Sequence, residues 1–247
     1  MSAAVIYQSL VQSLSQLDIP GKERQQLLNV LRRFEQSLVQ LMYEWMRECG
    51  HDHAESVVRC QPILVQHALI HFADDMSDGD ADYIQSVASD GVPLLCVMQN
   101  WVSLLLADSR WNADQRLAFF HCMHRVGVAQ MVEIRTNDWD GDAARYAAAD
   151  LNGQQFRAYF GLAARNASEL DEFGVVGYEF GAVFHTATDV CTHDERFWDL
   201  SDEERSLMIE WANGLWQGLY ARDIQCVNKR LGALVYRMNS INAGVMA

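Results

Sequence analysis

The stretch that decides the fold is ALIHFADDMSDGDAD, Ala68 to Asp82, in which an apolar segment runs directly into five aspartates within nine residues. The apolar segment predicts a buried helix. If the helix continues, Asp74 and Asp78 lie four residues apart on one face, with Asp75 turned to one side. Stacked carboxylates repel each other unless a cation lies between them, and Mg²⁺ is commonly held by one or two carboxylates together with water and substrate phosphate. The stretch therefore predicts a magnesium site at Asp74, Asp75 and Asp78.

A simpler interpretation is that a helix ends here and its aspartates are only solvated, as runs of like charge usually are. The apolar residues that precede the run, among them Val65, Leu69 and Phe72, favour a buried helix instead. An acidic cluster at the end of a buried helix faces a cavity as readily as solvent, so we prefer the metal-binding interpretation.

The composition predicts one mostly helical domain over residues 1–247, because half of the residues are hydrophobic and there are only three prolines. The formal net charge is −14, which argues against a nucleic-acid partner because phosphate contacts need clustered Lys and Arg. A phosphorylated ligand is still compatible with this charge, since a bound metal ion inverts the charge around it.

The sequence also predicts a cytoplasmic protein. Residues 1–5 carry no basic segment followed by an apolar core, and the longest apolar run, residues 92–107, is interrupted by Gln99 and Asn100. The six cysteines show no CxxC spacing and are expected to be reduced.

Apolar periodicity predicts roughly eight to ten helices, with no strand pair, internal repeat or linker. The helices are expected at about residues 4–16, 22–45, 55–73, 94–106, 114–136, 143–166, 169–192 and 203–239, the last open to division into two.

In such a helical chain, further segments resemble the trans-isoprenyl diphosphate synthases and, more broadly, the class I terpenoid synthases. DDMSD at residues 74–78 matches the first aspartate-rich motif, DDxxD, and His67 stands seven residues before it, where the family has a histidine. IPGK at residues 19–22 resembles the N-terminal PGK or GGK segment.

The remaining segments follow in the family's order. QMVE at residues 130–133 falls at the GQxxD motif, and YFGLAAR at 159–165 resembles the helix after the KT pair. GAVFHTATD at 181–189 resembles the GxxFQxxDD stretch that opens the second aspartate-rich motif.

This resemblance implies an all-α, single-domain helical bundle of the isoprenoid synthase type with a central apolar cavity. It implies an enzyme that uses more than one Mg²⁺ ion to ionise an allylic prenyl diphosphate. The implied catalytic and metal-binding residues are Asp74, Asp75, Asp78 and Asp189. The implied substrate-binding residues are Lys22, Arg24, His67, Gln130, Gln155, Phe156, Arg157, Phe184 and His185. A homodimer is also implied, for which the apolar segment 94–106 is a candidate.

The chain departs from the family where positive charge would bind a second diphosphate. Tyr83 and Ile84 replace two arginines after the first motif, and Gln155 and Phe156 replace the KT pair. The arginine that follows the family's lysine is displaced to Arg24.

The second motif keeps only Asp189, with threonines at positions 188 and 192. Residues 188–192 also partly resemble the (N/D)D(L/I/V)x(S/T)xxxE motif of terpene cyclases, but Arg196 stands at the final glutamate.

Three functions follow from these observations. A chain-elongating prenyltransferase is slightly favoured by His67 and Lys22, and the missing cationic residues disfavour it. A terpene cyclase, or an enzyme that prenylates another acceptor, needs no second diphosphate site. A non-catalytic binding or regulatory subunit is the third possibility.

Each residue outside the first motif also has a structural alternative. Asp189 is also explained as an acidic residue on a helix surface, and His67 as a hydrogen-bonded histidine of the core. Lys22 and Arg24 are also explained as solvated residues at the start of a helix. A zinc protein is a rival from another class, but the spacing of Cys49, His51, His53 and Cys60 matches no closed zinc site.

Overall fold

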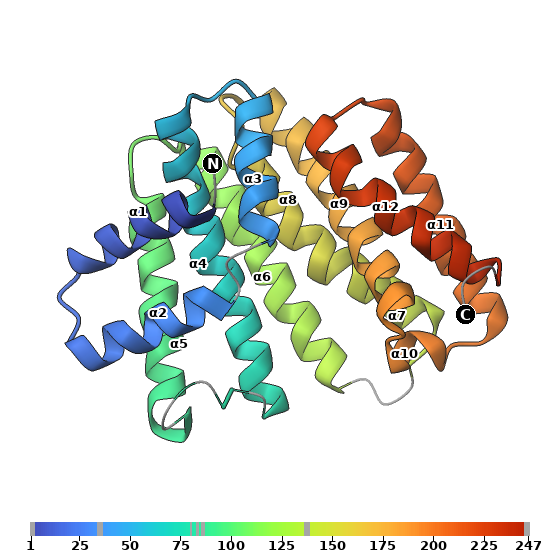
Figure 1. Cartoon of the computed structure of the whole chain (residues 1–247), viewed down its shortest axis with the longest axis horizontal. Coiled ribbons are helices and arrows are strands. Elements are labelled where there is room, and N and C mark those ends of the chain that lie inside the picture. The colour runs from blue at the N-terminus through green and yellow to red at the C-terminus, as the bar shows by residue number, and fades with distance from the viewer. Residues whose placement is uncertain are drawn as a thin grey trace. The chain divides into compact units, whose positions relative to one another are not determined.

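The computed structural model describes residues 3–33, 37–79, 81–82, 84, 87–135 and 139–244 (Figure 1). These residues form α-helices and one π-helical segment, and no strand occurs among them, which confirms the predicted all-α class. The chain divides into two compact units, residues 1–112 and 113–247, and each is described by itself. The single domain expected over residues 1–247 stays a prediction. In the described part of the chain, no helix has the length and hydropathy needed to cross a membrane.

The first unit is organised around its fourth helix, α4, which packs against each of the other helices of the unit. Its helices are α1 (Ala3–Ser15), α2 (Gly21–Arg33), α3 (Ser37–Glu48), α4 (His53–Asp78) and α5 (Val87–Leu106). The stretch that ends in the acidic motif is therefore the central element of this unit, with Leu64, Ala68 and Phe72 fully buried.

Both ends of α4 are fixed by local hydrogen bonds. At its start, the Asp52 carboxylate accepts the Glu55 amide at 2.8 Å. At its end, Gly79 adopts a left-handed conformation with φ 84°, and its N–H donates to the carbonyl of Asp75. The helix therefore runs five residues past Ala73, the predicted end, and carries the whole DDMSD motif.

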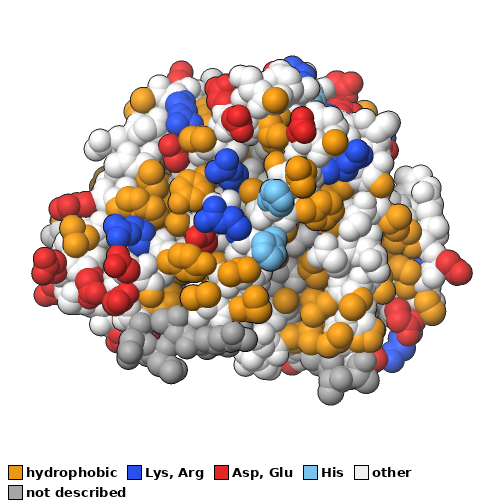
Figure 2. Space-filling model, turned by 180° about the vertical axis from the view of Figure 1, so that it is seen from behind, with side chains coloured by type: hydrophobic (Ala, Val, Ile, Leu, Met, Phe, Trp, Pro, Cys, Tyr) orange, Lys and Arg blue, Asp and Glu red, His pale blue; other side chains and the backbone are white. Residues whose placement is uncertain are grey.

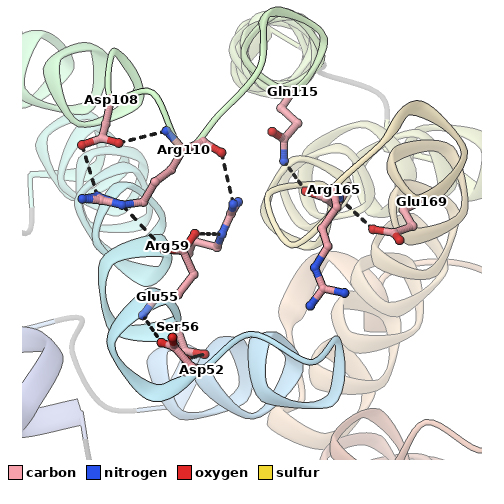
Figure 3. A network of polar contacts seen from close by, with 10 residues as sticks. Asp52, Glu55, Ser56, Arg59, Asp108, Arg110, Gln115, Arg165 and Glu169 are labelled. Atoms are coloured by element: carbon pink, nitrogen blue, oxygen red, sulfur yellow. Dashed lines mark hydrogen bonds and ion pairs between the residues drawn. The ribbon is translucent and has the colours of Figure 1, made fainter.

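A polar network joins the start of α4 to the end of the first unit (Figure 3). Arg59 is buried, and its Nε donates to Glu55 at 2.7 Å while its Nη2 donates to the carbonyl of Arg110 at 3.1 Å. Arg110 in turn pairs with Asp108 at 3.1 Å. The network satisfies the buried charge of Arg59, which would otherwise be costly.

The second unit is organised around α9, which packs against α8, α10, α11, α12 and the π-helical segment. Its elements are α6 (Ala113–Arg135), α7 (Gly141–Ala147), the π-helix η1 (Ala148–Gly153), α8 (Gln154–Gly161), α9 (Ala167–Thr192), α10 (Glu195–Trp198), α11 (Asp202–Ala221) and α12 (Gln225–Asn242).

Two glycines of α9 allow its backbone to approach η1 and α8 very closely. A Cβ on Gly181 would lie 2.2 Å from the carbonyl oxygen of Asn152, and one on Gly177 would lie 2.3 Å from that of Phe156. Only glycine fits at these two positions.

Aromatic side chains fill the space beside this contact. Phe156 lies 4.8 Å from Phe180 and 5.9 Å from Phe184, measured between ring centroids. A hydrogen bond also joins α6 to the end of α8 within this unit: the side chain of Gln115, labelled in Figure 3, donates to the carbonyl of Ala164 at 2.7 Å.

Some predicted helix limits differ from the structure. The helix expected at 22–45 corresponds to α2 and α3, and residues 34–36 between them lie outside the described part, so its continuity stays a prediction. The helix expected at 143–166 ends at Gly161, because Asn166 caps α9 and starts a new helix. The last helix, for which division was left open, does divide at Asp223, which has φ 53°. The short helix α10 was not predicted.

Candidate functional site

The first candidate site is the acidic end of α4. Asp74 and Asp78 are exposed in the last turns of this helix, and their four-residue spacing puts them on one face, as predicted. The Asp75 carboxylate points to α2, where its Oδ2 lies 3.2 Å from Nε of Arg33. The three aspartates therefore differ in exposure: Asp74 and Asp78 are exposed, whereas Asp75 is half-buried beside α2.

Two histidines precede these aspartates on α4. The rings of His67 and His71 meet edge to face with their centroids 4.4 Å apart. Burial lowers the pKa of both imidazoles. His71 lowers the pKa of His67 further, whereas Asp75 partly offsets the lowering of the His71 pKa. Both rings are therefore neutral near pH 7. We did not predict His71, although its position four residues after His67 and four before Asp75 was a usable signal.

Lys22 and Arg24, predicted to bind substrate, have partners within the first unit. Lys22 Nζ lies 3.3 Å from Asp90 Oδ2 at the start of α5. The guanidinium of Arg24 donates to the carbonyls of Ile19, at 3.1 Å, and of Leu17, at 3.4 Å. Arg24 thus stabilises the turn before α2, and Lys22 joins α2 to α5.

The second candidate site surrounds Asp189 on α9, in the second unit. Asp189 Oδ2 lies 3.3 Å from Nε2 of His185, and Nδ1 of His185 lies 2.8 Å from the amide nitrogen of Asn152. Burial and then the nearby carboxylates of Asp194 and Glu133 raise the pKa of Asp189 to about 8. Burial lowers the pKa of His185, although the same two carboxylates act in the opposite direction. Near pH 7 the Asp189 carboxyl is therefore mostly protonated, and the histidine beside it is neutral.

Arg196, which stands where the cyclase motif has a glutamate, also lies beside this site. Its Nη1 lies 2.7 Å from Glu133 Oε1, and its guanidinium stacks 5.4 Å from the ring of Trp139. Gln130 lies one turn before Glu133 on α6 and is half-buried. The hydroxyl of Thr192 donates to the carbonyl of Thr188 within α9, at 2.9 Å. We did not predict Asn152 or Trp139, and their separation in sequence from the motif gave no signal.

The remaining predicted residues belong to the interior of the second unit or to its edge. Gln155 is buried and donates to the hydroxyl of Tyr159 at 3.0 Å. Phe156 is buried in the aromatic cluster, whereas Phe184 is half-buried with the guanidinium of Arg230 5.7 Å from its ring. Arg157 lines a cavity of about 60 Å³ with Cys122 and Gly174 among its other walls.

The two candidate sites differ in how well they fit a magnesium ion. In the described part of the chain, no three His, Cys, Asp or Glu side chains are grouped closely enough to hold a metal ion by themselves. Mg²⁺ needs only one or two carboxylates when water and phosphate complete its shell, so Asp74 and Asp78 fit it. Asp189 fits less well, because metal ligands must be deprotonated and its neighbour Glu133 is already paired with Arg196.

The rival zinc site has no support from the described residues. Cys60 is buried inside the first unit, and Nδ1 of His53 lies 2.9 Å from the Tyr43 hydroxyl. All six cysteines are free; four are buried, whereas Cys49 is half-buried and Cys96 is exposed.

The sequence matches no protein-family model and no curated protein. Its structure is similar to that of a geranyltranstransferase from Thermotoga maritima, with a TM-score of 0.66 and 11% identity over 96% of this chain and 97% of that one. It is also similar to a geranyltransferase from Legionella pneumophila, with a TM-score of 0.60 and 14% identity over 97% and 94% of the two chains. The resemblance expected from the sequence motifs is thus confirmed at the level of fold: this chain has the all-α isoprenoid synthase fold.

Proposed function

We propose that this protein is a Mg²⁺-dependent enzyme that acts on an allylic prenyl diphosphate, with chain-elongating prenyl transfer slightly favoured. The observation that carries the proposal is the exposed pair of Asp74 and Asp78 in the last turns of α4. The fold shared with two geranyltransferases supports it.

The roles of the residues follow from their surroundings. Asp74 and Asp78 hold the metal, which when bound acts as a Lewis acid and neutralises the departing pyrophosphate. Asp75, next to them on α4, holds the guanidinium of Arg33 near this end of the helix through their ion pair. His67 and His71, kept neutral by burial, offer imidazole nitrogens to a polar group of the substrate. Phe184, half-buried in the second unit, remains a proposed substrate-binding residue.

Asp189 remains a proposed site residue, but its environment supports a role other than metal binding. A protonated carboxyl beside His185 donates a proton more readily than it binds a cation. Gln130, Gln155, Phe156 and Arg157 remain proposed substrate-binding residues. Two of them, Gln155 and Phe156, are buried and also pack in the interior of the second unit.

The acceptor decides between the alternatives. Elongation needs a second diphosphate site, and the engagement of Lys22 with Asp90 and of Arg24 with backbone carbonyls favours the cyclase or another acceptor. We keep elongation first because the two structural neighbours carry the names of geranyltransferases. A non-catalytic subunit is the remaining alternative.

We also propose a cytoplasmic homodimer. Hydrophobic side chains are frequent among the polar ones on the face shown in Figure 2. In the apolar segment 94–106 five side chains are buried, those of Leu94, Met98, Trp101, Val102 and Leu106. The side chains of Val92 and Leu104 on α5 are 64% and 59% exposed. These two residues are the candidates for a contact between subunits.

The proposed function is tested by incubating the purified protein with Mg²⁺ and geranyl, farnesyl or geranylgeranyl diphosphate, each with and without isopentenyl diphosphate. Pyrophosphate release and organic products are measured, with EDTA in place of Mg²⁺ as the control. Release that requires isopentenyl diphosphate and gives a longer diphosphate means elongation. Release without it, giving a hydrocarbon or alcohol, means a cyclase. No release from the folded protein under any of these conditions contradicts the enzymatic proposal for these substrates.

A further inference from the structure

Arg33 places a guanidinium at the acidic end of α4 from a different helix. It is the last residue of α2, and its Nε lies 3.2 Å from Oδ2 of Asp75. The Arg33 side chain is 45% exposed, whereas that of Asp75 is 20% exposed. The carboxylate of this ion pair is therefore mostly buried, whereas the guanidinium is partly accessible to solvent.

The local sequence supplies no cation of its own for a diphosphate bound at this end of α4. No Lys or Arg occurs between Arg59 and Arg110, while residues 74–82 contain five aspartates. A divalent ion on Asp74 and Asp78 only balances those two carboxylates, and a diphosphate brings several further negative charges. Any fixed positive charge beside the motif must therefore come from outside the segment that contains it.

The other basic residues of the first unit have contacts elsewhere. Lys22 binds Asp90, Arg24 binds backbone carbonyls, and Arg32 donates to the hydroxyl of Tyr7 at 2.8 Å. The remaining three arginines also have partners. Arg47 donates to a backbone carbonyl, Arg59 pairs with Glu55, and Arg110 pairs with Asp108.

We infer that Arg33 binds the diphosphate of the ligand proposed above, and that Asp75 is a positioning residue that holds its guanidinium beside Asp74 and Asp78. The inference rests on the proposed function and deepens it. A guanidinium presents five N–H donors in a planar fork, and the contact with Asp75 is made through Nε. The fork matches a phosphate better than an ammonium group does, so lysine is a poor substitute.

The test measures binding of inorganic pyrophosphate in the presence of Mg²⁺ by titration calorimetry. We expect Arg33→Gln to weaken binding at least tenfold and Arg33→Lys to weaken it less. Arg32→Gln is the matched control, because it removes the neighbouring arginine, and it should stay within twofold of the unaltered protein. Equal affinity of Arg33→Gln and Arg32→Gln would overturn the inference.

A second variant separates ligand binding from a merely structural link between α2 and α4. Asp75→Asn breaks the same ion pair but leaves the guanidinium in place. We expect it to weaken pyrophosphate binding, but less than Arg33→Gln does, because the guanidinium is kept but is no longer held in place. The two variants should have similar thermal stability. Equal loss of affinity in both variants would mean that only the link between the helices matters, and the inference would be wrong.

The binding and turnover measurements together separate failure of the Arg33 inference from failure of the proposed enzymatic function. Binding that depends on Arg33 without turnover of any allylic diphosphate supports the inference and contradicts the enzymatic proposal. Turnover with unchanged pyrophosphate affinity in Arg33→Gln contradicts the inference alone. A protein that binds no Mg²⁺-pyrophosphate at all contradicts the inference, whatever its turnover.

Discussion

Burial of single titratable residues gives this protein two opposite pH dependences. His67 has a pKa well below the usual value because it is buried beside His71, so the unfolded chain binds its proton first as pH falls. The contribution of His67 to stability is therefore complete above about pH 6.5 and is lost as pH falls below it.

We predict that His67→Gln reduces the loss of stability at acid pH. Urea denaturation at pH 7 and pH 5 should show that the unaltered protein loses roughly 1–2 kcal/mol more than the variant over this range. His121→Gln, which changes an exposed histidine on α6, is the control and should lose as much as the unaltered protein. Equal losses in all three proteins would show that His67 is not held neutral.

Asp189 acts in the opposite sense. Its pKa is raised to about 8, so between about pH 4 and pH 8 the folded protein keeps a proton that the unfolded chain has lost. The free energy of unfolding therefore falls as pH rises through this range and levels off above it.

Asp189→Asn should remove this dependence. Between pH 5 and pH 8 we expect the unaltered protein to lose roughly 2 kcal/mol or more relative to the variant, measured by urea denaturation. The exposed Asp171 supplies the control variant Asp171→Asn. If the Asn variant shows the same fall with pH, Asp189 is ionised in the folded protein and the case for it as a metal ligand becomes stronger.

For single residues, the sequence predicted which side chains share a helix face better than it predicted which side chains they contact. The spacing of Asp74 and Asp78 was enough to place them together, because both lie on one helix and helical periodicity fixes their face. The ion pairs of Asp75 with Arg33 and of Glu133 with Arg196 join residues far apart in the chain, and no local pattern carries that information.

Single helices are determined partly by local signals and partly by close packing. The core helices α4 and α9 were predicted within a few residues from apolar periodicity. The π-helical turns of η1 were not predicted, because a π-helix differs from an α-helix in hydrogen-bonding register and not in composition. The short α10 was also missed, since four residues give no periodic pattern.

The close approach of α9 to η1 predicts a strong effect of one methyl group. Gly181→Ala would place a carbon 2.2 Å from the carbonyl of Asn152, so the helices must separate. We expect a loss of about 3 kcal/mol or more in the free energy of unfolding, as for overpacked cores at the severe end. Gly214→Ala on α11 is the matched control, because a Cβ there meets nothing within 4 Å. It should be neutral or stabilise by about 0.5–1 kcal/mol. Equal stability of the two variants would contradict the described helix contact.

The whole molecule shows that the fold persists where sequence identity does not. At 11% and 14% identity, the chain still matches two geranyltransferases over nearly its full length. The short motifs and their order were enough to predict this fold, because each motif occupies a defined position along the series of helices. They were not enough to predict the acceptor of the proposed reaction, because positive charge that would bind a second diphosphate can come from several helices.

The proposed homodimer gives a prediction at this scale. Leu104 is 59% exposed on α5, and Leu104→Glu should convert the dimer to a monomer because it would bury a charge in an apolar contact. Light scattering after size-exclusion chromatography measures the mass directly. Leu207→Glu, which changes a leucine that is 58% exposed on α11, is the control and should leave the dimer intact. A dimer that survives Leu104→Glu would place the contact elsewhere.

The carboxylate pair of α4 is tested most directly by the rate of Mg²⁺-dependent pyrophosphate release from farnesyl diphosphate, with isopentenyl diphosphate present. We predict that Asp74→Asn and Asp78→Asn each lower this rate at least a hundredfold, because either change removes a metal ligand and costs about 3 kcal/mol of transition-state stabilisation. Asp114→Asn, at the exposed start of α6, should keep the full rate. Unchanged rates in both α4 variants would show that this pair does not hold the metal.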